Sequence, residues 1–211
     1  MPSPFPYDGR VRNPDLAAEL VDMAERDEYL REELLAEGVL HHGYVPRMRT
    51  LHRRNGDRLA AILEQLGRWP SRSIVGDDGA HGAWSIAMHD IANPGLMRAS
   101  RLLLAEAVRH HDADGADLAH IDDRIHMFET GRQIYGTHFG WGDDGAYGVW
   151  PPIEDPDNVE ARRRTVGLIS LADRLRALAD NPSPLPQQLT AEEIRSRRDE
   201  EAAFAHSVGW R

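Results

Sequence analysis

The stretch NPDLAAELVDMAERDEYLREELLAEG, from Asn13 to Gly38, decides the fold class of this chain. An asparagine followed by proline is typical of a helix start, because the asparagine side chain caps free amide groups and proline fits the first turn. Apolar residues then recur at spacings of three and four, at positions Leu16, Leu20, Met23, Leu30 and Leu34. This period is that of an amphipathic helix, so we expect a long helix with one face in a core.

Helical patterns continue outward from this stretch along most of the chain. Further helices are expected near residues 46–67, 80–92, 93–110, 116–130, 158–179 and, as a polar helix, 191–205. Residues 132–139 and 146–150 flank a glycine-rich segment and favour a short hairpin. The sequence therefore predicts a mainly α fold, a bundle of about six helices with a small β-hairpin near 132–150.

The expected organisation is a single helical domain with two appendages. Residues 1–12 contain three prolines and predict an extended lead. Residues 13–180 form the helical domain. The segment 181–211 begins with NPSPLP and combines a proline-rich linker with the polar C-terminal helix.

Composition and charge narrow the classes of partner. The 211 residues are 41% hydrophobic, which is enough for a sizeable core, and the net charge is −10. A negative protein is a poor match for a phosphate backbone, so we expect no nucleic-acid partner. No apolar run approaches the roughly 20 residues of a membrane span, and the first ten residues lack the apolar core of a secretory signal. We expect a cytoplasmic protein with a small-molecule substrate, no membrane partner and an oligomeric state that the sequence leaves open.

Two amino acids are missing, and their absence restricts the chemistry. The chain has no cysteine, and all 25 of its basic residues are arginine. These absences exclude thiolate nucleophiles, cysteine metal sites, lysine Schiff bases and a Walker-A lysine. Catalysis would use histidine, carboxylates, tyrosine, hydroxyls, arginine or a metal.

Polar residues interrupt the apolar faces of several expected helices. A charge on a buried face is costly unless it is paired, so these interruptions suggest one shared polar pocket. The alternative is a set of separate local pairs, such as Asp27 with Arg31 one turn later. The pooled residues are Asp27, Arg31, Asn55, His89, Asp123, Arg124 and one of the arginines 162–164.

A series of short motifs runs through residues 15–180 in a recognisable order. The motifs are Met23, Asp27 and Arg31; Arg68-Trp69-Pro70; Val75-Gly76; Met88-His89; Asp123-Arg124; Gly131, Gln133, Tyr135, Gly136, Thr137 and His138; and Arg162, Arg163, Gly167 and Leu168. This order resembles an uncharacterised bacterial family known only as a domain of unknown function. Arg68, Met88 and His138 depart from its pattern, which has glycine, glutamine and glutamine there. The resemblance implies a shared fold and pocket but no reaction, and we expect Gln133–His138 to form the lid or wall of that pocket.

His89 is the first candidate for a general acid or base, because histidine titrates near neutral pH. Asp27 or Asp123 would orient its ring, and Tyr135 and His138 would be second proton donors. Arg31, Arg124 and Arg163 would hold a carboxylate or phosphate. The expected catalytic residues are thus His89, Asp123, Tyr135 and His138, and the expected substrate-binding residues are Asp27, Arg31, Asn55, Arg124, Gln133, Thr137 and Arg163.

The leading functional hypothesis is an enzyme that acts on an anionic metabolite by metal-independent acid–base chemistry, with no cofactor. Hydrolysis, cyclisation and elimination all fit such a site. A non-catalytic ligand- or protein-binding module is the second hypothesis. The third is a metal-dependent hydrolase whose ligands come from separate helices, for example His89 with Asp123 and His138.

Overall fold

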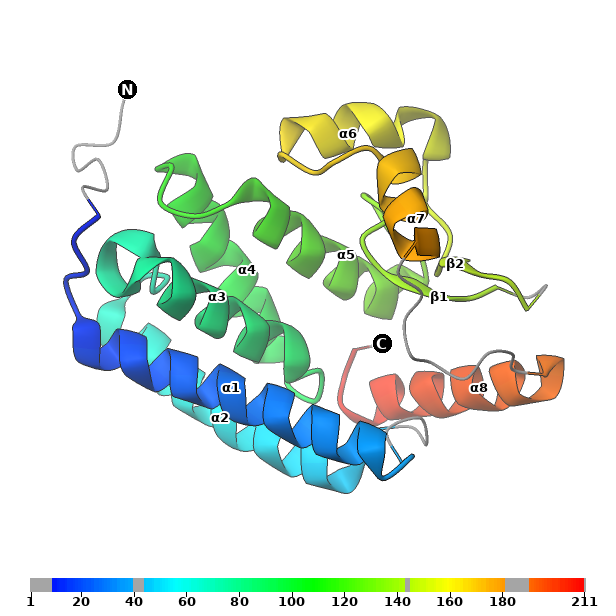
Figure 1. Cartoon of the computed structure of the whole chain (residues 1–211), viewed down its shortest axis with the longest axis horizontal. Helices are drawn as coiled ribbons and strands as arrows, with labels where there is room; N and C mark the ends of the chain where they lie inside the picture. The colour runs from blue at the N-terminus through cyan, green and yellow to red at the C-terminus, as the bar shows by residue number, and fades with distance from the viewer. Residues whose placement is uncertain (1–8, 40–43, 143–144, 181–189, 211) are drawn as a thin grey trace. The chain divides into compact units, whose positions relative to one another are not determined.

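The computed structural model describes residues 9–39, 44–142, 145–180 and 190–210. This part of the chain is mainly helical, with one two-stranded antiparallel sheet (Figure 1). The predicted fold class, mainly α with a small hairpin, is confirmed. The elements are α1 (Pro14–Ala36), α2 (Pro46–Leu66), α3 (Arg72–His89), α4 (Pro94–Arg109), α5 (Gly115–Thr130), β1 (Phe139–Trp141), β2 (Tyr147–Val149), a 3₁₀ turn (Pro156–Asn158), α6 (Val159–Thr165), α7 (Leu171–Asp180) and α8 (Ala191–Ser207).

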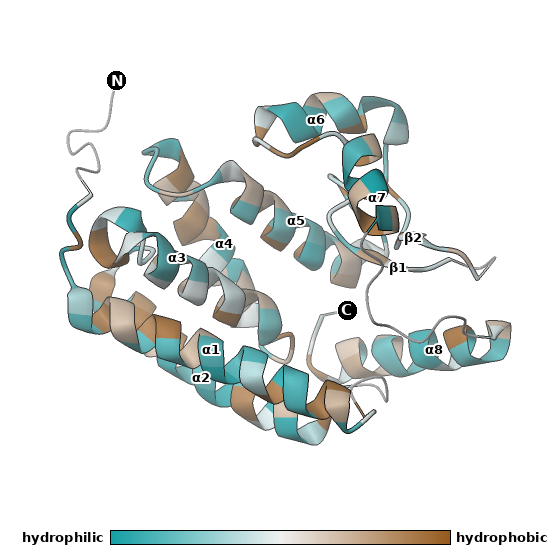
Figure 2. Cartoon of the chain, viewed as in Figure 1, coloured by the Kyte–Doolittle hydropathy of each residue, from teal (hydrophilic) through white to brown (hydrophobic). Residues whose placement is uncertain are grey.

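The chain divides into two compact units, residues 1–118 and residues 119–211, which we call the first and second units. In the first unit, α1 begins as predicted, with the Asn13 side chain accepting a hydrogen bond from the amide of Leu16 at 3.1 Å. Four residues of the apolar stripe of α1 are buried (Leu16, Leu20, Met23 and Leu34), Leu30 is half-buried, and Asp27 is buried within the stripe. Figure 2 shows hydrophobic and hydrophilic residues alternating along α1 and α2, as amphipathic helices require.

Helices α1 and α3 pack closely at a glycine. A Cβ atom added to Gly82 would lie 2.6 Å from the backbone oxygen of Leu20, so only glycine allows this separation of the two backbones. The packing places the middle of α1 beside the C-terminal half of α3. The polar residues on those two segments are thereby brought to one place.

Glycines also explain where the predicted helix boundaries differ from the structure. Helix α3 begins at Arg72, within a segment expected to be a loop, but its backbone leaves helical geometry at Gly76, with φ 73° and ψ 176°. The helix expected near 158–179 is divided into α6 and α7, and Gly167 between them has φ 77°. Only glycine adopts such angles without strain, and they end a regular helix.

The second unit contains the hairpin and the segment Gly131–His138. Strands β1 and β2 pair in antiparallel register, with Gly140 opposite Gly148. The expected first strand, 132–139, overlaps β1 only at Phe139, and the residues before it form a loop with an isolated bridge between Gln133 and Ile153. No described helix is both long enough and apolar enough to span a bilayer.

Candidate functional site

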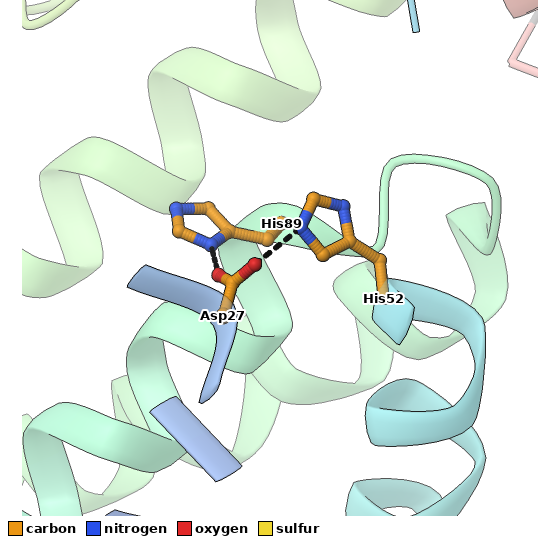
Figure 3. A group of neighbouring side chains, drawn as sticks. All are labelled: Asp27, His52 and His89. Atoms are coloured by element: carbon orange, nitrogen blue, oxygen red, sulfur yellow. Dashed lines mark hydrogen bonds and ion pairs between the residues drawn. The ribbon is translucent and has the colours of Figure 1, made fainter. Parts of the chain in front are cut away.

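Three side chains from three helices meet in the first unit: Asp27 of α1, His52 of α2 and His89, the last residue of α3 (Figure 3). The Oδ1 atom of Asp27 lies 2.7 Å from Nε2 of His52. The Oδ2 atom of Asp27 is hydrogen-bonded to Nδ1 of His89. One carboxylate therefore holds two imidazole rings, one on each oxygen.

The three side chains differ in their access to solvent. The side chain of Asp27 is 5% exposed and that of His52 is 9% exposed, whereas the side chain of His89 is 36% exposed. In Figure 3 the second ring nitrogen of His89 points away from Asp27. A molecule that approaches from solvent would therefore meet His89 before the other two.

Asp27 is an ionised carboxylate at neutral pH. Burial favours the neutral acid and would raise its pKa, but the hydrogen bonds from His52 and His89 together outweigh burial. The net result is that the pKa of Asp27 is lowered well below its usual value. A fixed negative charge between two imidazoles orients both rings.

Tyr44, which precedes α2, extends this hydrogen-bond network. Its hydroxyl lies 2.8 Å from Nδ1 of His52 and 3.4 Å from the backbone oxygen of His89. If the hydroxyl donates to His52, Nε2 of His52 carries the proton that faces Asp27. If it donates to His89, it accepts from Nδ1 of His52, and Nε2 must then share a proton or a cation with Asp27.

A second carboxyl group lies next to this site in the sequence. Asp90 is 1% exposed, and neither of its carboxyl oxygens has a hydrogen-bond partner among the described residues. Its Oδ2 atom occupies the space in which a Cβ on Gly56 would lie, one helical turn after His52. Burial raises the pKa of Asp90 to about 6, so this group titrates within the physiological range.

The structure brings together two of the predicted residues of the first unit, Asp27 and His89. Asn55 is buried beside them and donates a hydrogen bond of 3.3 Å to the backbone oxygen of Met23, which ties α2 to α1. Arg31 is exposed, and its ion pair is with Glu28, at 4.0 Å, instead of Asp27. Asn55 thus supports the site, and Arg31 lies on the surface.

His52 was not predicted, although the sequence contained the signal. Met48, His52, Asn55 and Leu59 follow one another at spacings of four, three and four, and all four are buried on one face of α2. A histidine on this apolar stripe, like Asp27 on the stripe of α1, is a polar side chain on a buried face and therefore needs a hydrogen-bond partner. The spacing of apolar residues along α2 is therefore enough to predict that His52 is buried beside the site.

Asp123 shapes the segment Gly131–His138 in the second unit. It is fully buried, and its carboxylate accepts hydrogen bonds from the amides of Ile134 (2.6 Å), Tyr135 (2.9 Å) and Thr137 (2.9 Å) and from the hydroxyl of Thr137 (2.9 Å). Four donors leave little capacity for a reactant. The structure therefore gives Asp123 a role in holding the loop, whereas the sequence suggested a catalytic one.

Gln133 closes the same loop from the other side. Its Oε1 atom accepts from the amide of His138 at 2.8 Å, and its Nε2 atom donates to the backbone oxygens of His138 (3.1 Å) and Pro151 (2.6 Å). Arg163 donates from Nη1 to the backbone oxygens of Tyr135 (2.7 Å) and Gly136 (3.2 Å). The backbone of the loop is therefore held by hydrogen bonds to side chains, and not by pairing with a neighbouring strand.

His138 is a neutral histidine at physiological pH. Burial lowers its pKa well below the usual value, and the charge of Arg124 lowers it further. Its ring meets that of His120 edge to face, with 6.2 Å between the centroids. Burial likewise lowers the pKa of His120, to about 4. Two neutral imidazoles thus lie together in the second unit.

The predicted residues therefore fall into two groups. Asp27, Arg31, Asn55 and His89 belong to the first unit, and Asp123, Arg124, Gln133, Tyr135, Thr137, His138 and Arg163 belong to the second. Within the described residues, the group that can hold a metal ion is Asp27, His52 and His89, with one ligand atom from each residue within 4.8 Å of the others. Two imidazole nitrogens and one carboxylate oxygen are ligands that suit zinc and iron.

The chain belongs to DUF6624, a family of unknown function whose model matches residues 14–183. The resemblance to an uncharacterised family is thereby confirmed. A search of curated proteins and a search of solved structures gave no match.

Proposed function

We propose that this chain is an enzyme that acts on a small molecule by acid–base chemistry, with His89 as the residue that exchanges a proton with the substrate. One observation carries the proposal. A histidine that solvent can reach is held by a buried, ionised carboxylate, Asp27. A small anionic metabolite as substrate and a cytoplasmic location, both expected from the sequence, belong to the same proposal.

The hydrogen bond to Asp27 determines which ring nitrogen of His89 is left to face the substrate. When Nδ1 of His89 donates to the carboxylate, Nε2 of the neutral ring carries a lone pair and can accept a proton from the substrate. The imidazolium that results is stabilised by the negative charge of Asp27. The same ring can then return the proton to a leaving group, as hydrolysis, cyclisation and elimination all require.

His52 supplies the second proton-binding group. Its ring centroid lies 5.3 Å from that of His89, and the two rings share one carboxylate. Tyr44 joins Nδ1 of His52 to the backbone oxygen of His89, so a proton on His52 has two hydrogen-bonded neighbours. An acid and a base within one site are the minimum for chemistry that takes and gives a proton.

The test is a variant of His89 measured on activated model substrates. We would assay the purified protein against p-nitrophenyl acetate, p-nitrophenyl phosphate and a small lactone. The activity found should fall by about 100-fold or more in His89→Ala, which is the usual contribution of general acid–base catalysis. His81→Ala is the matched control, because His81 is exposed on the same helix two turns earlier and should keep full activity. Full activity in His89→Ala would reject the proposal.

A metal-dependent hydrolase is the second candidate, and the three ligand atoms within 4.8 Å of one another favour it. A zinc ion held by Asp27, His52 and His89 would polarise a carbonyl or activate a water molecule. Elemental analysis of the purified protein and titration with zinc distinguish the two candidates. Activity that is lost with a chelator and restored by zinc supports the metal. Activity that survives the chelator, in protein free of metal, supports His89 alone.

A further inference from the structure

The second unit contains a cavity of about 380 Å³ whose polar lining is positive. Two arginines, Arg163 and Arg174, line it together with His120 and Thr137. Phe139 and Leu168 contribute apolar surface. Among the described residues that line this cavity there is no aspartate or glutamate, although the chain as a whole carries a net charge of −10.

Arg163 is a buried cation whose hydrogen-bond partners are neutral. Its side chain is almost fully buried, at 2% exposed for the residue. The guanidinium donates to the backbone oxygens of Tyr135, Gly136 and Ile169, the last at 2.8 Å. In the described part of the chain no carboxylate forms an ion pair with it. These carbonyl groups accept hydrogen bonds from Nε and Nη1 but do not neutralise the charge of the guanidinium group, and a buried charge is costly until it is neutralised.

Arg174 brings a second positive charge to the same cavity. It is an exposed residue of α7, and its guanidinium carbon lies 5.6 Å from the ring centre of Phe139. Burial lowers the pKa of Arg163, the charges of Glu160 and Asp123 raise it in part, and the like charge of Arg174 lowers it again. An anion between the two guanidinium groups would replace this repulsion by two attractions.

The two carboxylates whose charges act on Arg163, Asp123 and Glu160, already have hydrogen-bond partners. Asp123 accepts its four hydrogen bonds from the loop, and Glu160 accepts one from the amide of Leu171 at 2.9 Å. Neither lines the cavity. The positive lining is therefore open to a negative group from outside the chain.

We propose that this cavity binds a small organic anion that carries a carboxylate or a phosphate group. Nη2 of Arg163 and the guanidinium group of Arg174 donate hydrogen bonds to the charged group, because guanidinium groups match the oxygens of both anions. The ring of His120 supplies a further polar contact. Phe139 and Leu168 pack against an apolar part of the ligand. This binding site does not depend on the chemistry assigned to His89.

Calorimetry with inorganic phosphate and with succinate tests the site. We expect saturable binding of at least one of the two probes to one site on the full chain, and the better probe identifies the preferred anion. Arg174→Gln should weaken that binding by about 10-fold or more, the effect of losing one charge-assisted contact. Arg164→Gln is the matched control. Arg164 is exposed, follows Arg163 directly and does not line the cavity, so the same loss of charge should change the affinity by less than about twofold.

Three results would overturn the proposal. They are the absence of saturable binding of both probes, unchanged binding in Arg174→Gln, and equal weakening in Arg174→Gln and Arg164→Gln, which would indicate diffuse charge. Arg163 also holds the loop, so its variants would mix folding with binding, and the exposed Arg174 is the safer position. A second measurement follows His120 by NMR. A bound anion should raise the pKa of His120 from about 4, and its absence from the cavity would leave that pKa unchanged.

Discussion

Asp27 is the residue on which the candidate site depends. Its carboxylate is buried, ionised and shared by two imidazoles. Since its pKa is depressed, its contribution to stability is present above the usual pKa of an aspartate and is lost as the pH falls through the lower, folded-state value. Any change that removes this charge should therefore affect both the fold and the orientation of His89.

Asp27→Asn should destabilise the protein at pH 7 by about 2 kcal/mol, because two hydrogen bonds to a charged group are weakened. Urea unfolding monitored by circular dichroism measures this change. Asp22→Asn is the matched control on the same helix. Asp22 is half exposed and pairs with Arg26, and surface pairs contribute less than about 1 kcal/mol. Equal stability of Asp27→Asn and wild type would contradict the network.

Asp90 should make stability depend on pH in the opposite direction. Its pKa in the folded state is raised to about 6, so the folded protein holds this proton more tightly than the unfolded chain. The associated stabilisation is present below the usual pKa of an aspartate and is lost as the pH rises through about 6.

The neutral variant Asp90→Asn should therefore gain stability relative to wild type between pH 5 and pH 8. The expected gain is on the order of 2 kcal/mol, since one pKa unit corresponds to about 1.4 kcal/mol. Unfolding curves at the two pH values measure it. Asp78→Asn, at an exposed position on α3, should show no such dependence. A difference that is independent of pH would show that Asp90 does not titrate in this range.

At the scale of elements, the site depends on how closely α1 approaches α3. Gly82→Ala would place a Cβ atom against the backbone of Leu20, where the available distance is 2.6 Å. We expect the free energy of unfolding to fall by about 1–3 kcal/mol, as in other overpacked interiors. The hydrogen bond between Asp27 and His89 should also weaken. Thermal unfolding and the NMR shifts of His89 report the two effects. Gly148→Ala, where an added Cβ meets nothing within 4 Å, should be close to neutral.

The loop Gly131–His138 depends on α5 through Asp123. Asp123→Asn replaces one acceptor oxygen by a donor that faces the amide groups of the loop. We expect a loss of about 2–3 kcal/mol and faster hydrogen exchange at the amides of Ile134, Tyr135 and Thr137. The exposed Asp157 offers a control, since Asp157→Asn should leave those three amides protected. If hydrogen exchange at these amides is unchanged in Asp123→Asn, the carboxylate of Asp123 does not hold the loop.

At the scale of the whole molecule, periodicity predicted the fold class, and it found Asp27 because a charge on a buried stripe needs a partner. It could not say which partner. The partner of Asp27 is a histidine on α2 and another on α3, and the partners of Asp123 are backbone amides 11 to 14 residues away. Both depend on tertiary packing and on loop conformation, which the spacing of residues does not encode.

Helix boundaries were missed for a related reason. Glycine is compatible with many backbone angles, and the sequence does not show which of them a given glycine adopts. At Gly76 the chain turns and then continues as helix, whereas at Gly167 it turns and ends one. The two positions look alike in sequence, and their surroundings decide the outcome.

The single carboxylate shared by His52 and His89 has a consequence for how the first unit would meet an anion. With one ring protonated, the trio of Asp27, His52 and His89 is electrically neutral, and with both protonated it carries one positive charge. An anionic substrate would therefore favour the state with the additional proton, and its arrival would draw that proton from the buffer. The heat of binding would then change with the ionisation enthalpy of the buffer chosen, and the slope would count the protons taken up.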